Sequence, residues 1–116
     1  MDEHALTFRT SRIHLLKFFA SAEEQRRFQT EVCKSEGYAY DEFACWWADD
    51  FHPDSKLFRS AFSPTEIVIL SNFNNAFESA LTQIGEHVPN VEQLLSLTAW
   101  QSVIAAAASA HVALDP

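Results

Sequence analysis

Hydrophobic residues recur at helical spacing through most of the chain, and this pattern predicts an all-α fold. The firmest stripe has gaps of three and four residues: Ile67, Leu70, Asn74, Phe77, Leu81 and Ile84. Such gaps place residues on one face of a helix. The stripe is widened by Val68, Phe73, Ala76 and Ala80. A capping box in Ser63-Pro-Thr-Glu precedes it, with Pro64 at the first helical position. We therefore expect a long central helix near residues 64–84.

The first third of the chain predicts two further helices. One is marked by hydrophobic residues at helical spacing, Ile13, Leu16 and Phe19. Upstream, residues 6–10 alternate between apolar and polar types, which favours an extended segment. The second helix opens at Ser21, whose side chain can cap the helix while Glu24 reaches back to the cap backbone. Gly37 provides a left-handed end for this element.

Glycine and polar caps also divide the last third into helices. Gly85 follows the long stripe, where a left-handed C-cap is expected. Asn90 with Gln93 three residues later predicts the start of a short helix. Thr98 with Gln101 predicts the start of the last helix, which contains a run of four alanines on which another helix can pack closely. Together these segments predict a compact bundle of about five helices.

Length and composition set the class of protein. A chain of 116 residues fits a single helical domain, residues 1–116. Hydrophobic residues make up 47% of the sequence, which is enough for a packed core and excludes intrinsic disorder. The net charge of −8 disfavours binding to nucleic acid or to an anionic membrane and favours a basic protein partner. The alternative is that this charge only keeps the protein soluble.

Neither a targeting signal nor a membrane span is expected from the sequence. The first residues are acidic, whereas a secretory signal begins with basic residues. The longest weakly polar run, residues 103–113, is shorter than the roughly 20 residues that a membrane span needs. The two cysteines, Cys33 and Cys45, favour buried free thiols in a reducing compartment, although a single bridge between them stays open. We therefore expect a cytoplasmic protein.

The segment Tyr38–Phe51 combines aromatic and acidic residues to an unusual degree. On a helix its large aromatic side chains gather on one side: Tyr40, Phe43, Trp46, Trp47 and Phe51. Glu42 and Asp49 share another face, and Asp41 lies further round the helix. Like charges at helical spacing are mildly unfavourable, so a binding role is one reason to keep them. The alternative is a solvated face with lysine or arginine nearby.

Asp50 would point among the aromatic side chains, where an unpaired buried carboxylate is costly. Three arrangements avoid this cost: the helix ends by Ala48 and Asp50 caps the next turn, Asp50 meets an internal arginine, or it lies at the rim of an aromatic surface. The last arrangement would make an interface of aromatic anchors surrounded by acids, and the tryptophan pair would then be a hot spot rather than core. The candidate partner-binding residues are Asp41, Glu42, Asp49, Asp50, Asp54 and Trp46.

Motifs for catalysis, metal binding and cofactor binding are not found in the sequence. The tripeptide His52-Pro53-Asp54 matches the one by which J-domain co-chaperones engage their partner, but acidic residues precede it here in place of a basic helix, so we interpret it as a turn. The five histidines are dispersed, and two glycines cannot build a phosphate-binding loop. We therefore expect a protein that is not an enzyme and that binds no metal or cofactor. Asn74, inside the long stripe, is interpreted as a buried residue that sets packing register.

Three segments of the second half resemble small bacterial immunity proteins, such as those of contact-dependent growth inhibition systems. They are the capped helix containing Phe73-Asn74, the segment Val88-Pro-Asn-Val-Glu-Gln-Leu-Leu, and Trp100-Gln-Ser-Val-Ile-Ala. The resemblance covers roughly residues 62–108 and consists of common features such as helix caps and leucine pairs. It implies a protein that neutralises a basic toxin, typically a nuclease, by occluding it with an acidic surface. The alternative function is a helical scaffold or adaptor subunit, including a homodimer that meets through Trp46 and Trp47.

Overall fold

The computed structural model describes residues 2–32, 38–86, 88 and 90–114. Within these residues the chain forms seven α-helices and one π-helical turn, and it forms no strand, so the predicted all-α fold is confirmed. The elements are α1 (Glu3–Phe19), α2 (Ala22–Arg27), η1 (Phe28–Val32), α3 (Tyr38–Ala48), α4 (Lys56–Ala61), α5 (Pro64–Ile84), α6 (Val91–Ser96) and α7 (Thr98–Leu114). The π-helical turn η1 directly continues α2.

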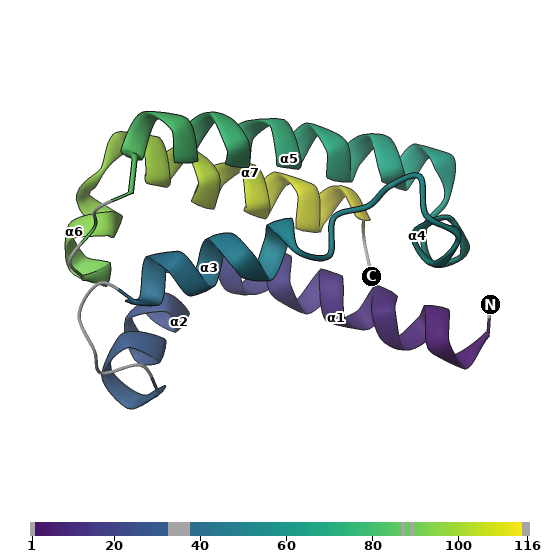
Figure 1. Ribbon diagram of the computed structural model, residues 1–116, viewed down its shortest axis with the longest axis horizontal. Helices are drawn as coiled ribbons and strands as arrows, with labels where there is room; N and C mark the ends of the chain where they lie inside the picture. Colours follow the sequence, from purple (N-terminus) through teal and green to yellow (C-terminus); the bar gives the residue numbers. More distant parts are fainter. Residues whose placement is uncertain (1, 33–37, 87, 89, 115–116) are drawn as a thin grey trace.

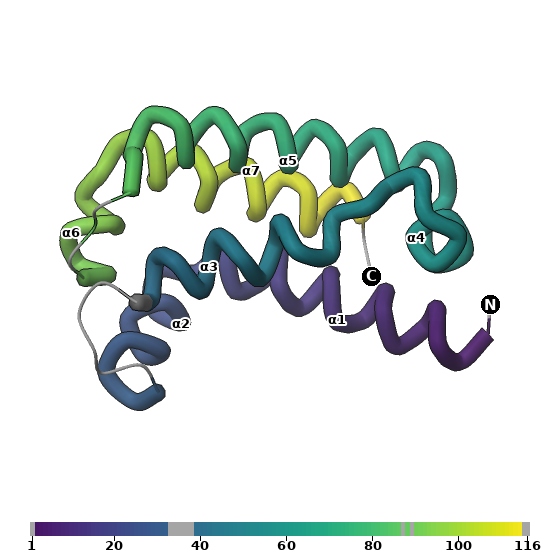
Figure 2. The backbone as a smooth tube through the Cα atoms, in the orientation of Figure 1, coloured from purple at the N-terminus to yellow at the C-terminus, as the bar shows by residue number. Residues whose placement is uncertain are grey.

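The four longer helices follow the long axis of a molecule that measures 40 × 26 × 22 Å. In Figure 1, α5 and α7 lie along one side, while α1 and α3 lie along the other. The helices α2 and α6 lie at one end, and α4 lies at the opposite end. The trace in Figure 2 shows how α6 reverses the chain, so that α7 runs back antiparallel to α5. None of the described helices is long and apolar enough to cross a lipid bilayer.

The long helix α5 begins and ends close to the predicted positions. Its capping box is complete, because the Ser63 hydroxyl accepts a hydrogen bond from the Glu66 amide while the Glu66 carboxylate accepts one from the Ser63 amide. Leu70, Phe73, Phe77 and Ala80 form its buried face. Val68, which was expected to widen that face, is 59% exposed. The hydrophobic face of α5 is therefore narrower than the sequence pattern indicates.

The helix α5 ends at Gly85, whose φ of 83° is positive as predicted. Its ψ of −157°, however, lies far from the left-handed helical region that was expected for this cap. This combination of φ and ψ lies in a region of backbone conformation where almost only glycine is found. The Gly85 amide still donates to the Leu81 carbonyl, which closes the last turn of the helix.

The prediction of an extended segment at residues 6–10 is wrong, because these residues belong to α1. Asp2 caps this helix, since its Oδ1 atom accepts a hydrogen bond of 2.7 Å from the Ala5 amide. Ala5 is fully buried, and it begins a helical stripe that continues through Ile13 and Leu16. An alternation of five residues is too short to outweigh this longer stripe and its cap.

The start of α2 follows the predicted cap only in part. The Ser21 hydroxyl accepts a hydrogen bond from the Glu24 amide at 3.1 Å, as expected. The Glu24 carboxylate accepts a hydrogen bond from Arg27, three residues ahead, at 3.0 Å. Ser21 therefore caps the helix, and Glu24 forms an ion pair with Arg27 on the helix surface. The predicted end at Gly37 lies outside the described residues.

The two C-terminal helices start at or next to the predicted residues. Asn90 caps α6, because its Oδ1 atom accepts a hydrogen bond of 2.8 Å from the Gln93 amide. The helix α7 already includes Thr98, and the Gln101 amide donates to the Leu97 carbonyl at 3.0 Å. Thr98 is therefore the first residue of α7 rather than its cap, and the predicted start is wrong by one position.

Aromatic side chains join the helices in the centre of the molecule. Trp100 of α7 is fully buried, and its ring stacks on that of Phe43 in α3 with centroids 6.2 Å apart. Gln25 of α2 is also fully buried, and its Oε1 atom accepts a hydrogen bond of 2.8 Å from Trp100 Nε1. The Gln25 amide group donates to the Phe19 carbonyl at 3.0 Å. This pairing allows a polar side chain to lie inside an aromatic core.

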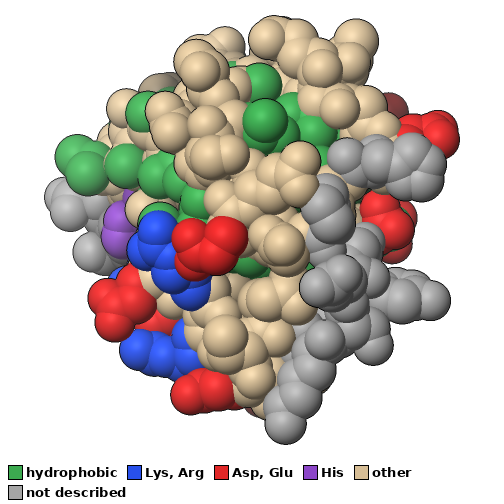
Figure 3. All heavy atoms as spheres, turned by 90° about the vertical axis from the view of Figure 1, so that its left-hand side faces the viewer, with side chains coloured by type: hydrophobic (Ala, Val, Ile, Leu, Met, Phe, Trp, Pro, Cys, Tyr) green, Lys and Arg blue, Asp and Glu red, His purple; other side chains and the backbone are tan. Residues whose placement is uncertain are grey.

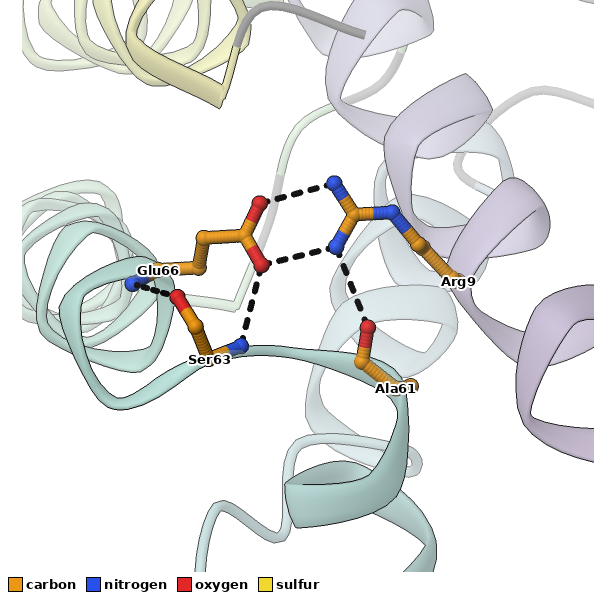
Figure 4. A network of polar contacts seen from close by, with 4 residues as sticks. All are labelled: Arg9, Ala61, Ser63 and Glu66. Atoms are coloured by element: carbon orange, nitrogen blue, oxygen red, sulfur yellow. Dashed lines mark hydrogen bonds and ion pairs between the residues drawn. The ribbon is translucent and has the colours of Figure 1, made fainter. Parts of the chain in front are cut away.

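An ion pair fixes α1 to the corner between α4 and α5, as Figure 4 shows. Arg9 Nη1 donates to Glu66 Oε1 at 2.8 Å, and Arg9 Nη2 donates to Glu66 Oε2 at 2.7 Å. Arg9 Nη1 also donates to the Ala61 carbonyl at the end of α4. The hydrogen bond to Arg9 lowers the pKa of Glu66, and the same bond raises the pKa of Arg9. Two-point pairing of this kind restricts geometry more than a single contact does.

Candidate functional site

The candidate surface is carried by α3, whose buried side is aromatic. Tyr40, Phe43 and Trp47 are buried with at most 5% of each residue exposed. They lie on one face because they recur at intervals of three and four residues. The Asp49 amide closes the last turn on the Cys45 carbonyl at 2.9 Å. The opposite side of α3 is therefore held towards solvent by the packing of its aromatic face.

The five predicted acidic residues are all exposed: Asp41, Glu42, Asp49, Asp50 and Asp54. Glu42 and Asp49 share one face, because seven residues make almost two full helical turns. Cys45 lies between them on that face and is also exposed. We call Glu42, Cys45 and Asp49 the acidic face of α3. Asp41 projects from a different side of the helix.

Most of these acids form no ion pair with another residue that the structure describes. Within the described part of the chain, ion pairs of the acidic residues named above involve only Asp50. At the end formed by α2 and α6 the situation differs, because basic and acidic side chains lie side by side there (Figure 3). Arg26 pairs with Glu92, and Arg27 pairs with Glu23 and Glu24. The negative charge of α3 is therefore less compensated than that of the α2–α6 end.

Asp50 meets an internal arginine, which is one of the three arrangements considered for it. The helix α3 ends at Ala48, and Asp50 Oδ2 lies 3.4 Å from Arg12 Nη2. Arg12 is 9% exposed, and its Nη1 atom donates to the Trp46 carbonyl at 2.9 Å. The cap of the next helix, α4, is Ser55 rather than Asp50. Burial lowers the pKa of Arg12, and the nearby Asp50 carboxylate opposes that shift.

The two adjacent tryptophans have different environments. Trp47 is 1% exposed, and its Nε1 atom donates to Asn74 Oδ1 at 2.9 Å, so Trp47 is core. Trp46 is half-buried, with its ring edge-on to Phe28 at a centroid distance of 4.9 Å and to Phe18 at 5.6 Å. The hypothesis of a dimer interface that contains both tryptophans is therefore wrong, because only Trp46 of the two reaches the surface.

Trp46 and Asp50 line the same open cleft between α1 and α3. This cleft has a volume of about 410 Å³, and α1 supplies Arg12, His14 and Phe18 to its walls. Leu15, Phe18 and Trp46 give the cleft an apolar part, and its other lining residues are polar or charged. The cleft offers an aromatic surface with a carboxylate at its edge, close to the acidic face of α3.

A second open cleft of about 660 Å³ lies between α3 and the C-terminal end of α5. Tyr40, Asp41, Gly85 and Glu86 line it. The Tyr40 hydroxyl donates to the Gly85 carbonyl at 3.1 Å. Burial raises the pKa of Tyr40, and the neighbouring Asp41 raises it further. Asp41 and Glu86 thus line the same cleft, and this was not foreseen from the sequence because it depends on how α3 packs on α5.

The tripeptide His52-Pro53-Asp54 forms a turn, as expected. The Ser55 amide donates to the His52 carbonyl at 3.0 Å, and the His52 ring lies 2.8 Å from the Asp49 carbonyl oxygen. Asp54 is exposed in this turn, outside α3. It therefore adds charge near the end of the acidic face without belonging to it.

Two further expectations concern reactive and metal-binding side chains. The expected burial of the Cys45 thiol is wrong, because this residue is exposed on α3, while Cys33 lies outside the described residues. Among the described residues, histidine, cysteine, aspartate and glutamate side chains do not gather into a group of three or more that could hold a metal ion. The arrangement that the structure brings together is thus an acidic helix face beside a half-buried tryptophan.

Arg12 is the residue that sequence reasoning missed. It joins α1 to the end of α3 through the Trp46 carbonyl and Asp50. The signal that could have found it is its position in the stripe of α1, one residue before Ile13 and four before Leu16. An arginine in such a stripe requires an acceptor on a facing helix.

Comparisons with protein-family models, with curated proteins and with solved structures find no match to this chain.

Proposed function

We propose that this protein is a non-catalytic binding domain that neutralises a basic protein, in the manner of a cytoplasmic immunity protein acting on a nuclease toxin. The observation that carries the proposal is the acidic face of α3. Glu42 and Asp49 are exposed on one side of a helix, form no ion pair with another described residue, and stand beside the half-buried Trp46. Neutralisation by occlusion needs such a surface and requires no chemistry.

Electrostatics supports a basic partner. The chain carries a net charge of −8, so a basic domain is attracted at long range, and the uncompensated acids of α3 orient the encounter. Nucleases that bind phosphate backbones present basic surfaces of the complementary kind. Glu42 and Asp49 then meet lysine or arginine side chains of the partner.

The tryptophan supports a stable contact once the two surfaces have met. Aromatic residues that are partly buried and surrounded by polar groups commonly contribute most of the binding energy of an interface. Trp46 is held by ring contacts with Phe18 and Phe28, so little conformational freedom is lost when a partner covers it. The adjoining cleft gives an apolar side chain of the partner a place to pack.

The test asks first whether a gene next to that of this protein encodes a basic toxin domain. The association rate with that domain is then measured by stopped-flow fluorescence at increasing salt. The variant Glu42→Lys/Asp49→Lys should slow association by about tenfold or more at low salt, and salt should reduce that difference. The control is Glu3→Lys/Glu78→Lys, which changes the net charge equally but alters exposed residues of α1 and α5.

The two double variants separate a surface effect from a charge effect. Equal slowing by both would mean that only net charge steers the encounter, and unchanged binding by the α3 variant would overturn the proposed surface. Trp46→Ala tests the contact itself and should raise the dissociation rate more than it lowers the association rate. Circular dichroism of each variant checks that the helices are retained.

A further inference from the structure

Arg12 lines the cleft between α1 and α3, and its hydrogen bonding is incomplete. The residue is 9% exposed, and its Nη1 atom donates to the Trp46 carbonyl at 2.9 Å. The Nη2 atom lies 3.4 Å from Ser11 Oγ and 3.4 Å from Asp50 Oδ2, beyond the usual hydrogen-bond limit of about 3.2 Å. The Nε atom is buried and donates no hydrogen bond to a described residue. A buried N–H group without an acceptor is costly, so this edge of the guanidinium is suited to an acceptor from another molecule.

The geometry of this edge of Arg12 matches a carboxylate. The Nε–H group and one Nη2–H group point the same way from the planar guanidinium, so together they bind the two oxygens of one carboxylate. The guanidinium is held in place by the Trp46 carbonyl and by the Phe8 ring, whose centroid lies 5.7 Å from its central carbon. Asp50 contacts only the Nη2 atom, and its side chain is 56% exposed. A ligand carboxylate that meets both nitrogens would therefore pair with Arg12 more closely than Asp50 does.

The other walls of the cleft suit the apolar body of a small ligand. Leu15, Phe18 and Trp46 line its volume of about 410 Å³, and Ser11 and His14 add a hydroxyl and an imidazole. A further open cleft of about 440 Å³ adjoins it and shares His14 and Phe18 with it. Binding sites for small molecules typically combine apolar walls with a few polar groups that fix the orientation of the ligand. The cleft has this composition.

The charge of α1 favours an anion more than the charge of the whole chain does. This helix carries three lysine or arginine residues and one glutamate, whereas the chain carries 8 basic and 16 acidic residues. Lys17 lines the adjoining cleft and forms no ion pair with another described residue. A small anion is therefore repelled less along α1 than at the acidic face of α3.

We propose that the cleft between α1 and α3 binds a small carboxylate with an aromatic or branched apolar body. The carboxylate accepts hydrogen bonds from Nε and Nη2 of Arg12 in place of Asp50, and the apolar body packs on Phe18 and Trp46. This site does not rest on the proposed function, because it needs no protein partner. Trp46 also belongs to the candidate surface, so a carboxylate bound in the cleft covers part of that surface.

Titration of the isotope-labelled protein with phenylacetate, followed by NMR, tests the proposal. We expect saturable shifts of the Arg12 Nε–H signal and of the Trp46 indole N–H signal, with a dissociation constant on the order of 1 mM. The control ligand is phenylacetamide, which has nearly the same shape but no charge. It should bind at least about tenfold more weakly, because a neutral amide pairs less strongly with a guanidinium.

The variant Asp50→Asn gives a test in which binding increases. It removes the carboxylate that competes for Arg12, so phenylacetate should bind about threefold or more tightly than to the wild type. Glu78→Gln is the matched control, since it removes one negative charge at an exposed position of α5 that lines neither cleft. It should bind phenylacetate as the wild type does. Arg12→Gln should lose binding, but this variant also loses a structural contact, so the gain in Asp50→Asn is the deciding result.

Three results would overturn the proposal. The first is the absence of saturable shifts up to about 20 mM phenylacetate. The second is equal binding of phenylacetate and phenylacetamide, and the third is equal affinity of Asp50→Asn and Glu78→Gln for phenylacetate. The spectrum of each variant shows whether it is folded. The titration contains no toxin, so its failure would leave the proposed function unaffected, and the reverse also holds.

Discussion

Trp47 of α3 donates a hydrogen bond of 2.9 Å from its indole nitrogen to the side-chain oxygen of Asn74 in α5. Trp47 is 1% exposed, so this N–H group has no access to water and depends on Asn74 for a partner. The bond connects the helix that carries the acidic face to the longest helix of the fold. It fixes how far α3 can slide along α5, which is the register role that the polar residue in the hydrophobic stripe indicates.

Replacing Asn74 should therefore destabilise the protein. Asn74→Ala leaves the buried Trp47 N–H unpaired, and we expect the free energy of unfolding to fall by about 1–3 kcal/mol. Urea denaturation followed by tryptophan fluorescence measures this change. The control is Asn75→Ala at the next position of α5, which is exposed and should be neutral because alanine favours the helix. If both variants lose equal stability, the hydrogen bond has no special role.

Arg12 should contribute more to stability through its neutral contacts than through its ion pair. Asp50 has a side chain that is 56% exposed and lies 3.4 Å from Arg12, so solvent screens the pair. Asp50→Asn should therefore cost less than about 1 kcal/mol. Arg12→Ala should cost about 2 kcal/mol or more, because it removes the bond to the Trp46 carbonyl and the packing of a buried side chain.

Chemical denaturation of the two single variants checks this order. If Asp50→Asn and Arg12→Ala lower the free energy of unfolding equally, the ion pair is the main contribution of Arg12 to stability. The comparison also bears on binding experiments, because Asp50 serves the fold as well as the candidate surface. Asp49, which belongs only to the acidic face, is the better position for testing a partner.

Stability should decrease in acid because of Glu66. The hydrogen bond to Arg9 holds the pKa of folded Glu66 below its ordinary value of 4.5. As the pH falls below 4.5, the unfolded chain takes up a proton at Glu66 more readily than the folded protein does, so protonation favours unfolding. The stabilisation is present in full above pH 4.5 and is lost as the pH falls through the lower pKa of the folded state.

Thermal unfolding between neutral pH and about pH 3 measures this dependence. Glu66→Gln should flatten the decrease in acid, because glutamine does not titrate. Glu78→Gln, at an exposed carboxylate of the same helix, is the control and should preserve the pH profile of the wild type. An identical profile for Glu66→Gln and the wild type would show that other carboxylates determine the response to acid.

Most of the helices can be predicted because their signals are local, but α4 was not expected, and the described residues form seven α-helices where about five were expected. The capping box at Ser63 and Glu66 and the cap at Asn90 satisfy amides within the same turn, so residues three positions apart predict them. The error at residues 6–10 arises from giving weight to a short alternation over a longer stripe. The ψ of Gly85 could not be predicted, because a glycine indicates a positive φ but leaves ψ undetermined.

The candidate site was predictable only where it depends on one helix. The shared face of Glu42 and Asp49 follows from their spacing of seven residues, and their exposure follows from the aromatic residues on the other side. The positions of Asp50 and Trp46 depend on contacts with α1: Asp50 meets Arg12, 38 residues earlier (50 − 12), and Trp46 meets Phe18, 28 residues earlier (46 − 18). Pairing between helices this far apart in sequence leaves no periodic signal in either one.

Gly85 provides a sharp test of backbone conformation at the end of α5. Its φ of 83° and ψ of −157° lie in a region that side chains with a Cβ atom avoid, whereas a Cβ built there meets no atom within 4 Å. Gly85→Ala should therefore lower the free energy of unfolding by about 1–3 kcal/mol through backbone strain, without a steric clash. Gly85→Asn should lower it by a similar amount, because asparagine tolerates the left-handed helical region but not this one. Urea denaturation of both variants gives the comparison, and an asparagine variant close to the wild type would mean that the residue adopts an ordinary left-handed cap in solution.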